Sequence, residues 1–297
     1  MNPSQIAEFE LVRGNRAPLE APIDLLVEVP HGATSTADFT GYAAQLTSPL
    51  PDRLIEFFHV NTDTGAPELG AAIARHFVAE APTRTAAIVR CRIPRTFIDC
   101  NRRIDAPPAD FKAAKVTPGL MPWITSVEDR VLLREAYDAY VDAVRTATLR
   151  LATDGAMLLL HTYAPRSVDV EVGPDIVTDL HAAYLPDVEP RWPLRPALDV
   201  IGRDLEGRNH APIAVVDALA ARMGLLGLEV AQSVTYPMHP STLAWDHALA
   251  RPGRVLCLEV RRDLVVTAFD PFVEKRIDTT KLERLAIPIA AALHRWW

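Results

Sequence analysis

Side chains that can do chemistry follow several apolar runs of this 297-residue chain. His31 comes directly after IDLLVEVP, and His161 comes directly after AMLLL. Asp63 lies in NTDTG behind another apolar run, and Glu259 lies within LCLEVRRD. In an open α/β sheet the carboxyl ends of the strands meet at one edge, where ligands bind. If these runs are strands, two histidines and two carboxylates converge at that edge.

A cluster of fixed charges follows one more apolar run. AAIVRCRIP is followed by RTFIDCNR, residues 95–102, which contains Arg95, Asp99, Asn101 and Arg102. One interpretation is a salt-bridged strand end, in which Asp99 pairs with Arg95 or Arg102. The other is an anion-binding edge of an active site. The shared position with the histidines and carboxylates favours the second interpretation.

These residue types match the parts of a metal-dependent hydrolase. Two histidines and one carboxylate hold zinc and leave a position open for water. A glutamate that is not a ligand can move a proton from that water to a leaving amine. An arginine beside the carbonyl stabilises the developing oxyanion, and an Asn-Arg pair suits a substrate carboxylate. The residues therefore predict hydrolysis of an amide that carries a carboxylate.

Five segments of the chain together resemble one known family. They are VEVPHGAT, NTDTGAPEL, RTFIDCNR, LLLHTY and CLEVRRDL, and they occur in the order and at about the spacing of the N-formylglutamate amidohydrolase family, over residues 23–266. RTFIDCNR also resembles the substrate-binding segment of zinc carboxypeptidases and aspartoacylases. The resemblance implies a phosphorylase/hydrolase-like α/β fold, a three-layer αβα sandwich with a mostly parallel mixed sheet.

The resemblance also implies roles for individual residues. His31 and His161 match metal ligands, Glu259 matches the general base, and Arg95 matches the arginine that polarises the carbonyl. Asn101 and Arg102 match the pair that holds the substrate carboxylate. The zinc ligands are then His31, Asp63 and His161, and we expect one Zn²⁺ per chain, although other divalent metals use the same ligand types.

One departure from the carboxypeptidase pattern concerns the third ligand. Those enzymes place a carboxylate three residues after the first histidine, where this chain has Thr34. We expect Asp63 to replace that carboxylate, with Glu68 as the reserve. Asp63 could instead cap the helix predicted to begin near Pro67.

Glu259 also has an alternative to its catalytic role. It could form a structural salt bridge to Arg261, which lies two residues on and on the same face of a strand.

Hydrophobic periodicity predicts alternating strands and helices. We expect strands at 23–30, 86–94, 156–163, 228–236 and 255–266, and we also take the apolar run at 53–63 as a strand. Helices are expected at 67–81, 125–155, 209–227 and 280–297. Thr125 or Ser126 should cap the long second helix, and Gly155 should end it. The absence of a linker predicts a single catalytic domain over residues 1–297.

Bulk properties narrow the class of protein. The formal net charge is −7 and no basic run occurs, which argues against nucleic-acid and anionic-membrane partners. The chain begins without the pattern of a signal peptide, and no apolar run reaches 18 residues. Three cysteines at unsuitable spacing for a metal knuckle are expected to be buried thiols. We therefore expect a cytoplasmic protein that acts on a small molecule.

The functional hypothesis is a zinc-dependent hydrolase that cleaves the amide bond of an N-acyl amino acid similar to N-formylglutamate. One alternative keeps the site and changes the substrate, giving a carboxypeptidase-like metallopeptidase. Another alternative is a non-catalytic carboxylate-binding protein that has lost its metal, and the missing carboxylate at Thr34 is the feature that favours it.

Overall fold

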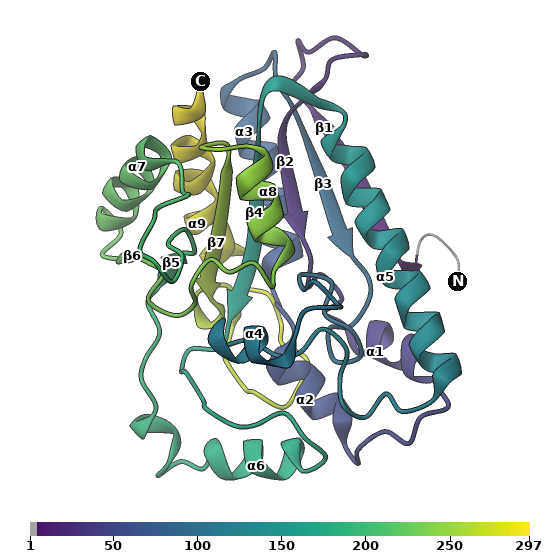
Figure 1. The fold of residues 1–297 in the computed structure, drawn as a ribbon. Helices are drawn as coiled ribbons and strands as arrows, with labels where there is room; N and C mark the ends of the chain where they lie inside the picture. Colours follow the sequence, from purple (N-terminus) through teal and green to yellow (C-terminus); the bar gives the residue numbers. More distant parts are fainter. Residues whose placement is uncertain (1–4) are drawn as a thin grey trace.

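A seven-stranded mixed sheet runs through the middle of the computed structural model, which describes residues 5–297 (Figure 1). The strand order is β1-β3-β2-β4-β7-β5-β6. β3, β2, β4 and β7 are parallel neighbours, while β1 and β5 run antiparallel to β3 and β7. The strands are β1 (Ala7–Arg13), β2 (Ile23–Val29), β3 (Thr85–Cys91), β4 (Leu151–Tyr163), β5 (Leu198–Val200), β6 (Val230–Gln232) and β7 (Val255–Arg261).

Helices cover both faces of the sheet and complete a three-layer αβα fold (Figure 1). Apolar side chains of α3, α7 and α9 pack on one face, and those of α1, α2, α5, α6 and α8 pack on the other. The predicted fold class is therefore confirmed. The helices are α1 (Thr36–Ala43), α2 (Leu54–Asn61), α3 (Ala66–Glu80), α4 (Pro108–Ala113), α5 (Val127–Thr148), α6 (Ile176–Ala183), α7 (Ile213–Gly224), α8 (Leu243–Ala250) and α9 (Thr279–Leu293).

The central strands are near-continuous apolar runs because both of their faces are buried. On β2, Leu26 packs into the cluster beneath α5, and Leu25 and Val27 pack into the cluster beneath α3 and α9. Parallel strands covered on both sides favour this composition. The same burial leaves the carboxyl ends of β2, β4 and β7 as the places where polar side chains can gather.

The prediction of a strand at 53–63 was wrong, because this segment contains the helix α2. Its buried side chains include Leu54, Phe57 and Phe58, which recur at helical rather than strand spacing. The neighbouring prediction was correct: α3 begins at Ala66 with proline in its first turn.

The predicted end of the long helix was also wrong. Ser126 caps α5 through a bond from the Asp129 amide, as expected, but the helix ends at Thr148. Gly155 lies inside β4, where the pairing with β2 shifts register. A Cβ at Gly155 would stand 2.9 Å from the Ala152 carbonyl oxygen, so the irregular strand requires glycine there.

Two further expectations concern the cysteines and the membrane. Cys91, Cys100 and Cys257 are buried and free, as predicted. Within residues 5–297, no helix combines the length and the apolar character needed to cross a membrane.

Candidate active site

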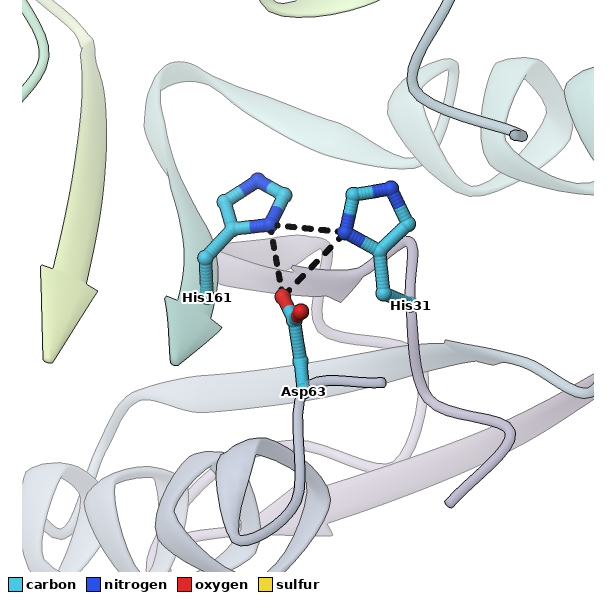
Figure 2. A group of neighbouring side chains, drawn as sticks. All are labelled: His31, Asp63 and His161. Atoms are coloured by element: carbon cyan, nitrogen blue, oxygen red, sulfur yellow. Dashed lines mark hydrogen bonds and ion pairs between the residues drawn. The ribbon is translucent and has the colours of Figure 1, made fainter. Parts of the chain in front are cut away.

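Three predicted metal ligands meet at the carboxyl edge of the central strands (Figure 2). His31 follows the end of β2, Asp63 follows the end of α2, and His161 lies near the carboxyl end of β4. All three side chains are buried. Segments separated by 130 residues therefore present their polar atoms to one point.

The donor atoms form a compact triangle. Asp63 Oδ2 lies 3.2 Å from His31 Nδ1 and 3.0 Å from His161 Nδ1, and the two Nδ1 atoms are 3.2 Å apart. Ligands at about 2.0–2.1 Å from a tetrahedral zinc are roughly 3.3 Å from one another. The three residues thus fit a divalent metal and leave a fourth position for another ligand.

Asp99 determines which nitrogen of His31 faces this triangle. Asp99 Oδ1 lies 2.8 Å from His31 Nε2. An ionised carboxylate only accepts hydrogen bonds, so we assign the imidazole proton to Nε2. His31 Nδ1 then presents a lone pair toward Asp63 and His161, which is the arrangement that a metal ligand requires.

Asp99 is held as an anion by the charges around it. Burial alone would raise the pKa of its carboxyl, but Arg102, His31 and Arg95 outweigh burial and hold that pKa well below its usual range. Arg95 Nη2 donates to Asp99 Oδ2 at 2.8 Å. The salt bridge proposed for RTFIDCNR therefore exists, and the same carboxylate also orients His31. The anion-binding interpretation of this segment stays a prediction.

The other two residues of this segment have different surroundings. Asn101 Nδ2 lies 3.5 Å from His161 Nε2, beside the triangle. Arg102 is buried, and each of its guanidinium nitrogens has a protein partner: Nε and Nη1 donate to the carbonyls of Thr117 and Asn101, and Nη2 lies 3.3 Å from Asp99. Binding of a substrate carboxylate by Arg102 stays a prediction, and it would require Arg102 to release one of these partners.

Glu259 stands next to His161 in the sheet. The two residues are register partners on the parallel strands β7 and β4. Its Oε2 atom is buried and has no hydrogen-bond partner among residues 5–297. Burial raises the pKa of Glu259. An unpartnered carboxyl oxygen with a raised pKa, beside a candidate metal site, is suited to accepting and donating a proton.

The structural alternatives weighed for Glu259 and Asp63 are not what the structure shows. Arg261 bonds Asp263 at 2.8 Å rather than Glu259. The N-cap of α3 is Gly65, without a side-chain cap, while Asp63 Oδ2 lies 3.0 Å from His161 Nδ1 and accepts from the Thr162 amide. The reserve ligand Glu68 is exposed on α3, outside the triangle.

Sequence reasoning missed a buried arginine that connects two of the ligand-bearing segments. Arg262 Nη1 donates to the Val60 carbonyl at 2.8 Å, and Nη2 donates to the Thr162 carbonyl at 3.0 Å. Val60 precedes Asp63 in the chain, and Thr162 follows His161. The residue was visible in CLEVRRDL, but nothing in the sequence distinguishes it from Arg261, whose side chain bonds elsewhere.

Comparison with known proteins supports the fold. No family profile and no curated protein matches the chain. A crystal structure of N-formylglutamate amidohydrolase from Ralstonia eutropha matches with 19% identity and a TM-score of 0.58, over 97% of this chain and 98% of that one. A gene product of Agrobacterium tumefaciens matches with 17% identity and a TM-score of 0.55, over 98% and 94% of the two chains. The protein therefore has the fold that these structures share.

Proposed function

We propose that the protein is a zinc-dependent amidohydrolase that cleaves the amide bond of an N-acyl amino acid similar to N-formylglutamate. One observation carries the proposal: the donor atoms of His31, Asp63 and His161 converge beside the unpartnered carboxyl oxygen of Glu259. The likeness in fold to an N-formylglutamate amidohydrolase agrees with it.

The chemistry follows from the residues around the triangle. Zinc, when bound by His31, Asp63 and His161, supplies Lewis acidity toward a carbonyl and a water molecule. Glu259 takes the proton from the attacking water and delivers it to the leaving nitrogen. Arg95 lies beside the triangle, with Nη1 3.4 Å from Asp63 Oδ1, and would supply positive charge to a substrate oxygen bound there.

The ligand set counts against a binder that has lost its metal. That alternative depended on Thr34, which occupies the position of the carboxypeptidase carboxylate. Asp63 supplies a carboxylate oxygen from a different segment and completes a three-donor set. With the two imidazole Nδ1 atoms and this oxygen facing one another, the arrangement is favourable when both nitrogens are deprotonated and a cation lies among the three atoms.

The first experiment measures the metal content of the purified protein and of the His31→Ala variant by elemental analysis. We expect close to one zinc per chain in the wild type and a large loss in the variant. The zinc-loaded protein should then release the acyl group from N-formyl or N-acetyl amino acids and leave peptides intact. A wild-type protein that takes up no divalent metal, even when zinc is offered, would contradict the proposal.

A further inference from the structure

An N-acyl amino acid carries a free carboxylate, and a buried or half-buried carboxylate needs a cation. If the proposed function is correct, a residue of this site must supply that cation. Arg95 and Arg102 both lie in RTFIDCNR, and both already pair with Asp99. All three nitrogens of Arg102 are used within the protein. Transferring either arginine to the substrate would weaken the anchoring of Asp99 and, through it, of His31.

Arg195 lies at the same carboxyl edge of the sheet and is not paired with Asp99. Its Nε donates to the Ser167 hydroxyl at 3.1 Å, and its Nη1 reaches the Ala164 carbonyl at 3.5 Å. Among residues 5–297, no carboxylate forms an ion pair with it, and its Nη2 makes no hydrogen bond. The side chain is partly exposed. One edge of the guanidinium therefore remains available to a ligand.

The surroundings of Arg195 hold it in place beside the metal site. Its guanidinium lies 5.0 Å from the ring centre of Tyr163 and 5.6 Å from that of Tyr236. Tyr163 follows His161 by two residues on β4, so both side chains point to the same face of the sheet. The Arg195 amide donates to Pro165, and its carbonyl accepts from Arg261.

The sheet register agrees with this placement. β5 runs antiparallel to β7, with Leu198 opposite Val260 and Asp199 opposite Glu259. Arg195 precedes β5, so it lies beyond the carboxyl end of β7, the strand that carries Glu259.

We propose that Arg195 binds a carboxylate of the N-acyl amino acid, with the rings of Tyr163 and Tyr236 forming the walls of that subsite. A guanidinium fixed between aromatic rings presents two parallel donors to a carboxylate. Arg195 then determines specificity for acidic over neutral substrates, while Arg102 remains with Asp99.

The test compares substrates that differ only in the carboxylate. The zinc-loaded wild type and the Arg195→Gln, Arg195→Lys and Arg102→Gln variants are assayed on N-formylglutamate and on its two monoamides. The control is Arg191→Gln, which removes an exposed arginine of the same loop whose Nη2 lies 3.9 Å from Asp187. The measured quantity is the ratio of kcat/KM for the acid to kcat/KM for each amide.

We expect Arg195→Gln to lower this ratio about ten- to hundredfold for one of the two amides, because a charge-assisted pair is lost. Arg195→Lys should recover part of the ratio, and Arg191→Gln should keep the wild-type value. If Arg195 had only a structural role, the acid and the amides would lose activity in parallel and the ratio would not change. A ratio that collapses in Arg102→Gln but not in Arg195→Gln would also overturn the proposal.

A separate measurement distinguishes failure of the subsite from failure of the proposed function. Calorimetry records the binding of N-acetylglutamate to the zinc-loaded protein whether or not any substrate is turned over. We expect the Kd to rise about tenfold or more in Arg195→Gln and to stay unchanged in Arg191→Gln. Equal affinity in wild type and Arg195→Gln would refute the carboxylate subsite, whereas binding without hydrolysis would refute only the amidohydrolase activity.

Discussion

His161 and Glu259 occupy paired positions on the adjacent parallel strands β4 and β7. Paired residues of neighbouring strands point to the same face of a sheet. The candidate ligand and the candidate base are therefore placed by backbone hydrogen bonds, not by a loop. Glu259 is also paired with Asp199 on β5, so strands lie on both sides of it. Such a placement restricts the distance between the base and the metal site.

The Glu259→Gln substitution tests the general-base assignment. Glutamine keeps the shape of the side chain but cannot take up the proton, so we expect kcat to fall by about 10²- to 10⁴-fold. Zinc content should stay at the wild-type level, because Glu259 is not among the three donors. Turnover close to wild type on a competent substrate would show that another residue moves the proton.

Much of the fold could be predicted because the central strands are apolar on both faces and the helices between them are amphipathic. α2 was mistaken for a strand because LIEFFHV is a short apolar run, and such runs occur in buried strands and buried helices alike. β5 was not predicted because only three residues form it, and its pairing with β7 is a tertiary contact. β1 was missed on the exposed edge, where its side chains alternate only weakly.

The site was predictable in its residues but not in its contacts. His31, Asp63 and His161 could be selected because each lies at or just beyond the end of an apolar run. Pairing of Asp99 with Arg95 or Arg102 was anticipated, but its bond to His31 across 68 residues became visible only in the structure. No local pattern encodes such a pairing, because it depends on the order of β3 and β2 in the sheet.

Asp99→Asn tests the link between RTFIDCNR and the metal site. The substitution removes the negative charge that holds the proton on His31 Nε2 and that pairs with Arg95. We expect zinc affinity to fall about 10- to 100-fold, measured by competition with a chromophoric chelator. Asp246→Asn serves as the control, because Asp246 pairs with Arg103 at the surface. Unchanged zinc affinity in a folded Asp99→Asn protein would mean that His31 is oriented by other contacts.

Lys275 predicts a pH dependence of stability that is independent of the metal. Its Nζ is buried and donates to the carbonyls of His59, Pro271 and Val273, with no carboxylate partner among the described residues. Burial lowers the pKa of Lys275 from 10.5 to about 7. Between these two values the unfolded chain binds more protons than the folded protein, so the free energy of unfolding rises with pH.

The measurement is urea denaturation at pH 7 and pH 9, with a chelator present, for the wild type and for Lys275→Met. The lysine should contribute on the order of 2 kcal/mol to the rise in unfolding free energy over this range. Lys275→Met should lack this contribution and be more stable relative to the wild type at pH 7 than at pH 9. Lys281→Met, which removes a partly exposed lysine, should follow the wild type. If the wild type and Lys275→Met show the same pH dependence, the ammonium of Lys275 is not desolvated in the folded protein.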